Sequence, residues 1–134
     1  MNTLKELYNL KPDNSGLSTG LINWYNQVIN KTYEELDVTD VSKMYRQEIA
    51  LEIVVNKAID LILINPYDGE YTDGGLLELI TRFELSMIEN SKLLKLTALL
   101  ERLNSEYLSF DWCCDEDMSN FKTNLEILMN RIIR

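Results

Sequence analysis

The chain has 134 residues, enough for one domain that packs its apolar side chains around a single core. Two prolines and five glycines are too few for the turns of a many-stranded sheet, and the lack of histidine excludes Ser-His and Cys-His catalysis and the usual zinc sites. A net charge of −9 makes nucleic acids and anionic membranes poor partners and favours a basic protein.

The N-terminal part of the chain predicts two helices separated by a loop rich in Pro, Gly, Ser and Asn. Thr3 and Glu6 have the spacing of a capping box, which predicts a short helix over residues 4–10. Apolar residues recur every three or four positions over residues 21–36 and predict a second helix. We expect this helix to break where Thr32 can cap a separate turn.

Residues 41–64 predict one long helix around which the others pack. Its second half is apolar on almost every side, apart from a narrow polar stripe formed by Glu48, Glu52, Asn56, Lys57 and Asp60. We expect Thr39 or Asp40 to cap this helix and Asn65-Pro66 to end it. The stripe also argues against a membrane span, which needs about twenty nearly uninterrupted apolar residues.

The second half of the chain predicts three further helices. A turn-rich loop precedes a helix over residues 76–84, which Asp73 is placed to cap. Apolar residues three and four positions apart predict a helix over residues 86–107 and, after another loop, a last helix over residues 118–132. The predicted fold is therefore all-α: a single-domain antiparallel bundle of five to six helices over residues 1–134.

Candidate catalytic and metal-binding residues are few. Asp68, Glu70 and Asp73 lie close together like calcium ligands, but an EF-hand starting at Asp68 needs glycine at position 73 and glutamate at position 79. Lys57 could serve as a desolvated Schiff-base lysine, although a position along the polar stripe near Asp60 is the simpler interpretation. We therefore predict that the protein is not an enzyme and holds no cofactor or metal.

The two cysteines indicate the cellular compartment. Cys113 and Cys114 are adjacent, and adjacent residues do not form an unstrained disulfide. The first ten residues also lack the continuous apolar core of a signal peptide. Both features favour a reducing cytoplasm.

The negative charge is concentrated in two windows of the sequence. Residues 58–81 contain five acids and no base, and residues 103–121 contain five more acids and no base. The two windows together carry −10, which leaves +1 for the rest of the chain. A basic protein partner is one explanation of such windows, and a solubilising surface is the alternative.

Aromatic residues lie among these acids, and rings surrounded by charges of one sign are typical of a recognition surface. We expect Tyr71 and Trp112 to be exposed, whereas Tyr107 and Phe110 are expected to close the end of the bundle. The predicted partner-binding residues are Tyr67, Asp68, Glu70, Tyr71, Asp73, Asp111, Trp112, Asp115, Glu116 and Asp117.

Short motifs over residues 36–80 carry a family resemblance. They are Asp40-Val41-Ser42-Lys43-Met44-Tyr45-Arg46-Gln47, Asn65-Pro66-Tyr67-Asp68-Gly69-Glu70, Asp73-Gly74 and Leu76-Leu77. With these motifs the chain resembles the all-helical immunity proteins of bacterial contact-dependent growth inhibition (CDI) systems. Within the motifs we assign structural roles, at a helix start, a helix stop and a turn, to Arg46, Gln47, Asn65, Pro66 and Gly69.

The resemblance implies a cytoplasmic protein that binds and neutralises the toxic C-terminal domain of an effector delivered by a sibling cell. Such toxins are often nucleases with basic clefts, so an acidic immunity protein would occupy the cleft and exclude RNA or DNA. Two other functions stay open at this point. One is an acidic helical mimic or adaptor that binds a host nucleic-acid-binding protein, and the other is a carboxylate-based hydrolase, which would need two acids converging in a pocket.

Overall fold

The computed structural model describes residues 2–13, 15–16 and 19–133. These residues form seven α-helices and three short 3₁₀ turns, which confirms the predicted all-α class. The elements are α1 (Leu4–Tyr8), α2 (Gly20–Val28), η1 (Tyr33–Glu35), α3 (Val38–Arg46), α4 (Leu51–Ile64), α5 (Gly75–Thr81), η2 (Leu85–Met87), α6 (Asn90–Glu106), η3 (Tyr107–Ser109) and α7 (Asp115–Ile132).

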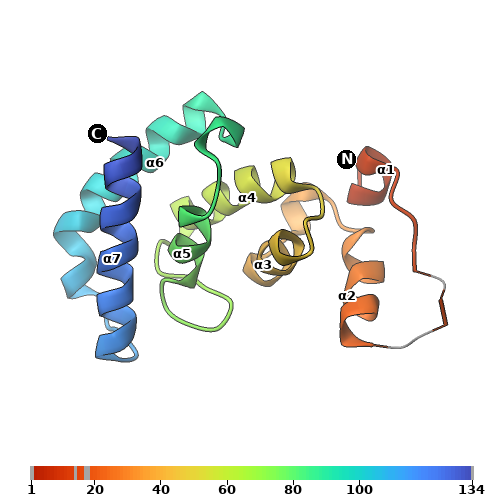
Figure 1. The fold of residues 1–134 in the computed structure, drawn as a ribbon, viewed down its shortest axis with the longest axis horizontal. Coiled ribbons are helices and arrows are strands. Elements are labelled where there is room, and N and C mark those ends of the chain that lie inside the picture. Colours follow the sequence, from red (N-terminus) through yellow and green to blue (C-terminus); the bar gives the residue numbers. More distant parts are fainter. Residues whose placement is uncertain (1, 14, 17–18, 134) are drawn as a thin grey trace.

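The helices are arranged along an elongated molecule with α4 at its centre (Figure 1). α6 and α7 run antiparallel at one end, and α1 and α2 lie at the other. α4 contacts α3, α5 and α6, so it joins the two ends. Its middle is fully buried, as the side chains of Val54, Ala58, Ile59 and Ile62 show. Of the predicted central helix over residues 41–64, the second half therefore does lie at the centre, as α4.

The single long helix predicted over residues 41–64 is wrong. The chain forms α3 and α4 instead, joined by a turn over residues 47–50 in which Glu48 and Ala50 have φ values of 55° and 49°. The two helices pack against each other across this turn. Side-chain periodicity does not reveal this turn, because no glycine or proline marks it and apolar residues continue on both sides.

Several local signals are confirmed. Thr3 and Glu6 form the predicted capping box at the start of α1. The second predicted helix breaks as expected: α2 ends at Val28, and a separate turn, η1, follows. At the start of η1, Glu35 accepts a hydrogen bond from the Thr32 backbone N–H at 3.0 Å. Asn65 ends α4 in an extended conformation, as expected for a residue before proline.

Two predicted helix caps are wrong. Asp37, rather than Thr39 or Asp40, begins α3: its carboxylate accepts from the Asp40 N–H at 2.8 Å, and Asp40 accepts in return. α5 begins after Gly74, whose φ of 78° is accessible to glycine, and Asp73 accepts a hydrogen bond from a distant loop instead. The observed caps, Asp37 and Gly74, each lie within three residues of the predicted ones, where sequence alone separates neighbouring candidates poorly.

Asp40 is a buried charge that ties α3 to the N-terminal helices. Its exposed fraction is 3%, and it accepts hydrogen bonds from Lys31 Nζ at 2.7 Å and Trp24 Nε1 at 3.0 Å. Burial by itself would raise the pKa of Asp40, but the hydrogen bonds from Lys31, Trp24 and the Asp37 backbone outweigh it and hold the pKa below its usual value. This carboxylate therefore has a structural role.

Candidate functional site

Two loops that are far apart in the sequence both lie in the lower part of the view in Figure 1, and their side chains contact each other. The first loop, residues 65–74, joins α4 to α5, and the second loop, residues 110–114, joins η3 to α7. The Asp73 carboxylate accepts a hydrogen bond from the Cys113 backbone N–H at 3.1 Å. The rings of Tyr67 and Phe110 stack with centroids 4.0 Å apart. The two acidic windows therefore adjoin in space.

The first loop is held in one shape by contacts within it. The Gly74 N–H donates to the Tyr67 carbonyl at 2.6 Å and closes the loop. A Cβ on Gly69 would lie 2.1 Å from the Thr72 carbonyl oxygen, so only glycine fits there. A structural role for Gly69 was the interpretation from sequence, and this close approach supplies its physical reason.

An ion pair fastens the same loop to α3. The Arg46 guanidinium donates two hydrogen bonds to the Glu70 carboxylate, at 2.8 and 3.2 Å. The Glu70 side chain is only 8% exposed, whereas that of Arg46 is 47% exposed. The hydrogen bonds to Glu70 raise the pKa of Arg46 above its usual value. Glu70 therefore already has an internal partner.

An aromatic cluster, formed by residues of both loops and of α7, joins the two loops. Tyr67, Phe110, Trp112 and Phe121 pack with centroid separations of 4.0 to 5.4 Å. Trp112 is half-buried here, and its Nε1 donates to the Tyr107 carbonyl at 2.7 Å, so its expected exposure is wrong. The predicted role in closing the bundle is confirmed for Tyr107, which packs against the core and Phe121, whereas Phe110 contacts Tyr67 and Trp112 of the loops. Burial in this cluster, with the nearby Glu106 charge, raises the pKa of Tyr67.

Tyr71 is the exception among the aromatic residues of the two loops. It lies in the braced first loop, and its exposed fraction is 82%, as predicted. A large ring on a rigid loop loses little conformational entropy when a partner covers it. Tyr71 is therefore the aromatic side chain of this region that is best placed to contact another molecule.

Tertiary structure also decides which carboxylates carry uncompensated charge. Asp60, Glu70 and Glu78 of the first window pair with Lys92, Arg46 and Arg82, and Glu106 of the second window pairs with Arg102. In the part of the chain that the structure describes, none of the other six acids forms an ion pair. With Tyr71 they form what we call the acidic loop surface: Asp68, Tyr71, Asp73, Asp111, Asp115, Glu116 and Asp117.

The charges at the start of α7 also have a local role. Asp115, Glu116 and Asp117 occupy its first turn, where backbone N–H groups favour negative charge. Asp115 and Glu116 are exposed and Asp117 is partly buried. The helix terminus therefore accommodates three acids side by side without a neighbouring base.

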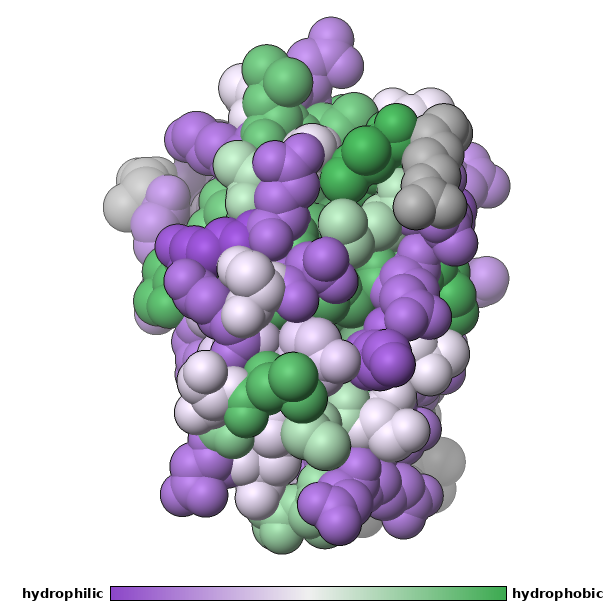
Figure 2. Space-filling model, turned by 90° about the vertical axis from the view of Figure 1, so that its left-hand side faces the viewer, coloured by the Kyte–Doolittle hydropathy of each residue, from purple (hydrophilic) through white to green (hydrophobic). Residues whose placement is uncertain are grey.

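Around this end of the molecule the surface is mixed. Figure 2 views the α6–α7 end and shows hydrophobic side chains in separate patches among hydrophilic ones. Leu94 and Leu108, which are 73% and 68% exposed, are the most exposed apolar residues of the α6 and η3 segments. Cys113 and Cys114 are exposed free thiols. Across residues 2–13, 15–16 and 19–133, no group of three His, Cys, Asp or Glu side chains is arranged to hold a metal ion.

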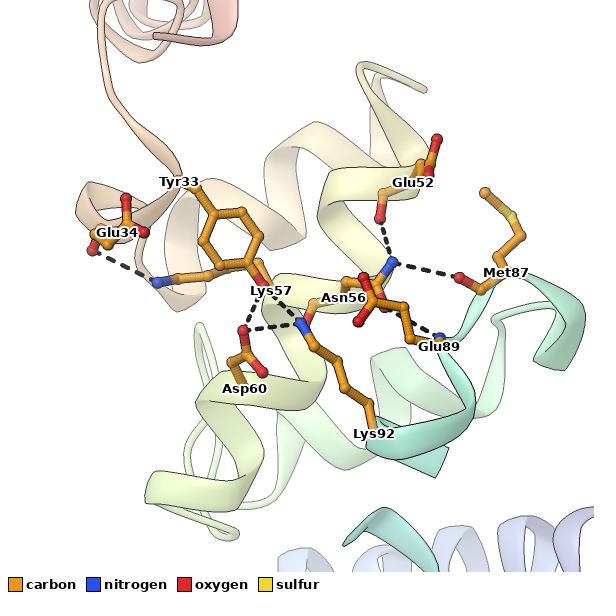
Figure 3. Close-up of polar contacts among 9 residues, drawn as sticks. All are labelled: Tyr33, Glu34, Glu52, Asn56, Lys57, Asp60, Met87, Glu89 and Lys92. Atoms are coloured by element: carbon orange, nitrogen blue, oxygen red, sulfur yellow. Dashed lines mark hydrogen bonds and ion pairs between the residues drawn. The ribbon is translucent and has the colours of Figure 1, made fainter. Parts of the chain in front are cut away.

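A second polar cluster, which the sequence did not predict, lies on α4 (Figure 3). The Tyr33 hydroxyl donates to the Asp60 carboxylate, and Lys92 Nζ donates to the same carboxylate at 3.0 Å. Burial and the hydrogen bond to Asp60 raise the pKa of Tyr33 well above its usual value. Asn56 accepts from the Glu89 N–H at 3.3 Å. These bonds join α4 to η1 and α6.

Lys57, expected along the polar stripe near Asp60, forms no ion pair with that carboxylate. It is buried, its Nζ lies 3.5 Å from the Glu34 carbonyl oxygen, and it stands 4.9 Å from the centroid of the Tyr33 ring. Lys92, which is 32 residues from Asp60 in the sequence, takes the place beside that carboxylate. No local pattern could have identified this pair, because its members come from different helices.

These observations define an all-helical protein in which six acids without an ion pair lie on two adjoining loops and on the first turn of α7. Comparison with family models finds a match to the CDI immunity proteins over residues 6–97. The match covers more than half of the chain, which therefore belongs to this family, as the resemblance predicted. No curated protein matches the chain.

Membership has consequences for function. The CDI immunity family neutralises CDI toxins, and its members are generally not enzymes. The partner that the family implies is the cognate CDI toxin. No helix in the described part of the chain has both the length and the apolar character to cross a membrane.

Proposed function

We propose that this protein acts in the cytoplasm and neutralises a CDI toxin that is a nuclease, by placing its acidic loop surface in the basic cleft where the toxin binds RNA or DNA. The toxin is then unable to reach its substrate. The observation that carries this proposal is that six carboxylates without an ion-pair partner lie on the two adjoining loops and on the first turn of α7, which follows the second loop. Charges of one sign on a surface of this kind attract a basic cleft over distances of about 10 Å in physiological salt.

The residues of the two loops divide into two groups under this proposal. Tyr71 and the unpaired acids contact the toxin, because Tyr71 is exposed and the acids are exposed or partly exposed and form no ion pair. Tyr67, Glu70 and Trp112 hold the loops in position through the aromatic cluster and the pair with Arg46. A rigid surface binds more tightly than a mobile one because less ordering accompanies binding.

The first experiment is direct. The toxin domain encoded beside this protein's gene is mixed with the purified protein, and both complex formation and hydrolysis of RNA and DNA are measured. We expect a one-to-one complex with an affinity well below micromolar and loss of hydrolysis. The absence of a complex at micromolar concentration, or a complex that leaves hydrolysis intact, would refute the proposal.

Charge reversal then tests the surface. Asp115→Lys combined with Glu116→Lys should slow association on the order of tenfold and reduce its dependence on salt. Glu126→Lys combined with Glu101→Lys, two exposed positions on α7 and α6 outside this surface, changes the net charge by the same amount and serves as the control. An equal effect of the control would show that only total charge matters and that the acidic loop surface is not the interface.

A further inference from the structure

A hollow of about 320 Å³ lies between the two loops. Its volume is near the lower limit of small-molecule sites, roughly 300 Å³, so it suits one side chain better than a larger group. Residues of both loops and of α7 line it, including Tyr67, Asp68, Tyr71, Asp73, Phe110 and Asp117. It is therefore a composite of segments that only the tertiary structure brings together.

The lining combines aromatic rings with negative charge. Tyr67 and Phe110 are stacked and partly exposed, so they offer apolar and ring surface inside the hollow. Asp68, Asp73 and Asp117 also line it, and in the described residues none of them is ion-paired. This combination is complementary to a cation that is carried on an apolar stem.

Two of these carboxylates are held in place before any partner arrives. Asp73 accepts the Cys113 N–H at 3.1 Å, and Asp68 accepts the Gly69 N–H at 2.8 Å. One oxygen of each is thereby oriented, and the other is left available for a donor from outside. The remaining acid of the lining, Glu70, differs because both of its oxygens accept from Arg46.

We infer that the hollow receives one basic side chain of the toxin, arginine in preference to lysine, and that this single residue contributes a large share of the binding energy. The inference rests on the proposed function, since it concerns the same surface. The stem of the arginine would lie against Tyr67 and Phe110, and its guanidinium would donate to the carboxylates of Asp68, Asp73 and Asp117. Arginine fits better than lysine because its planar head stacks on rings and donates several hydrogen bonds at once.

The two cysteines supply a closely matched test. Cys113 lines the hollow, whereas the adjacent Cys114, also exposed, does not. Cys113→Arg places a basic side chain of the protein itself at the hollow, and Cys114→Arg adds the same charge one residue away. We expect Cys113→Arg to weaken toxin binding on the order of tenfold or more, and Cys114→Arg to weaken it about twofold. Calorimetry at physiological salt measures both, after circular dichroism confirms that both variants are folded.

A second pair of variants does not depend on added bulk. Asp117→Asn removes a charge that lines the hollow, and Asp115→Asn removes one from the same helix turn outside it. We expect the first to weaken binding several times more than the second. Each arginine and lysine of the toxin is also changed to glutamine, one at a time. One of these changes should cost about tenfold or more in affinity, and this loss should largely disappear against Asp117→Asn.

The outcomes separate the two proposals. Suppose that the unchanged proteins bind, that the two members of each matched pair weaken binding equally, and that no single toxin residue accounts for most of the affinity. The hollow is then not a receptor, and the proposed function stands. If the unchanged protein forms no complex with the toxin, the proposed function fails. If the toxin residue with the largest effect is a lysine, the preference for arginine is overturned, but the hollow still receives a basic side chain.

Discussion

Arg46 and Glu70, 24 residues apart in the sequence, form a two-point ion pair that fastens the loop before α5 to the end of α3. The carboxylate is nearly buried, so the loss of its partner would leave a charge with little access to water. The pair therefore contributes to the shape of the first loop more than to the charge of the surface. It also explains why an acid in the acidic window need not face the partner.

Glu70→Ala should lower the free energy of unfolding by about 1–2 kcal/mol, since a charge-assisted, partly buried pair is lost. Urea denaturation at pH 7 measures the change. Glu78→Ala is the control, because its pair with Arg82 is exposed on both sides and should contribute less than about 0.5 kcal/mol. Equal effects of the two substitutions would show that Glu70 has no special structural role.

The turn between α3 and α4 makes Ala50 a site for stabilisation. Its φ of 49° is unfavourable for a residue with a Cβ, by roughly 1 kcal/mol or more. We expect Ala50→Gly to leave the stability unchanged or raise it by up to about 1 kcal/mol, whereas Ala58→Gly inside α4 should lower it by about 1 kcal/mol or more. Thermal unfolding compares the two. A loss of stability in Ala50→Gly as large as that in Ala58→Gly would contradict the left-handed turn.

Asp40 should make stability depend on acid pH. Its pKa is lower in the folded protein than in the unfolded chain, so its contribution is present above the usual aspartate pKa of about 3.9 and is lost as the pH falls through its folded value. Asp40→Asn should be less stable at pH 7 and should lose less stability than the unchanged protein between pH 5 and pH 3. Urea denaturation at these pH values measures both. Parallel pH profiles for the two proteins would contradict this assignment.

Tyr33 should act in the opposite pH range. Its pKa is raised in the folded protein, so its contribution is present below the usual tyrosine pKa of about 10 and is lost as the pH rises above it. Tyr33→Phe removes the hydrogen bond to Asp60 and should cost about 1 kcal/mol at pH 7, with a flatter stability profile above pH 10. Tyr71→Phe, at the exposed ring, is the control and should change the free energy of unfolding at pH 7 by less than about 0.5 kcal/mol. Ultraviolet titration of the phenols should show that the tyrosine titrating at the highest pH, later than Tyr67 and Tyr8, is the one that Tyr33→Phe removes.

The parts of the fold that could be predicted from the sequence depend on contacts between residues close together in the chain. The capping box of Thr3 and Glu6 and the end of α4 at Asn65 each involve a span of three residues or fewer. The helical class follows from apolar residues three and four positions apart, which must share one face of a helix. The concentration of acids in two windows is likewise visible in the sequence.

Tertiary structure decided which of those acids remain unpaired and where they face. Glu70 and Asp60 form ion pairs with Arg46 and Lys92, which lie on other elements. Trp112 is partly buried because its ring packs against Tyr67 and Phe121. The turn at residues 47–50 cannot be detected in the apolar pattern. Apolar residues recur at helical spacing on both sides of it, because α3 and α4 both pack against the same core. Ion pairs, ring contacts and the hollow between the loops depend on distances in space between segments far apart in the chain. The folding of the whole chain sets those distances, and no local pattern of residues records them.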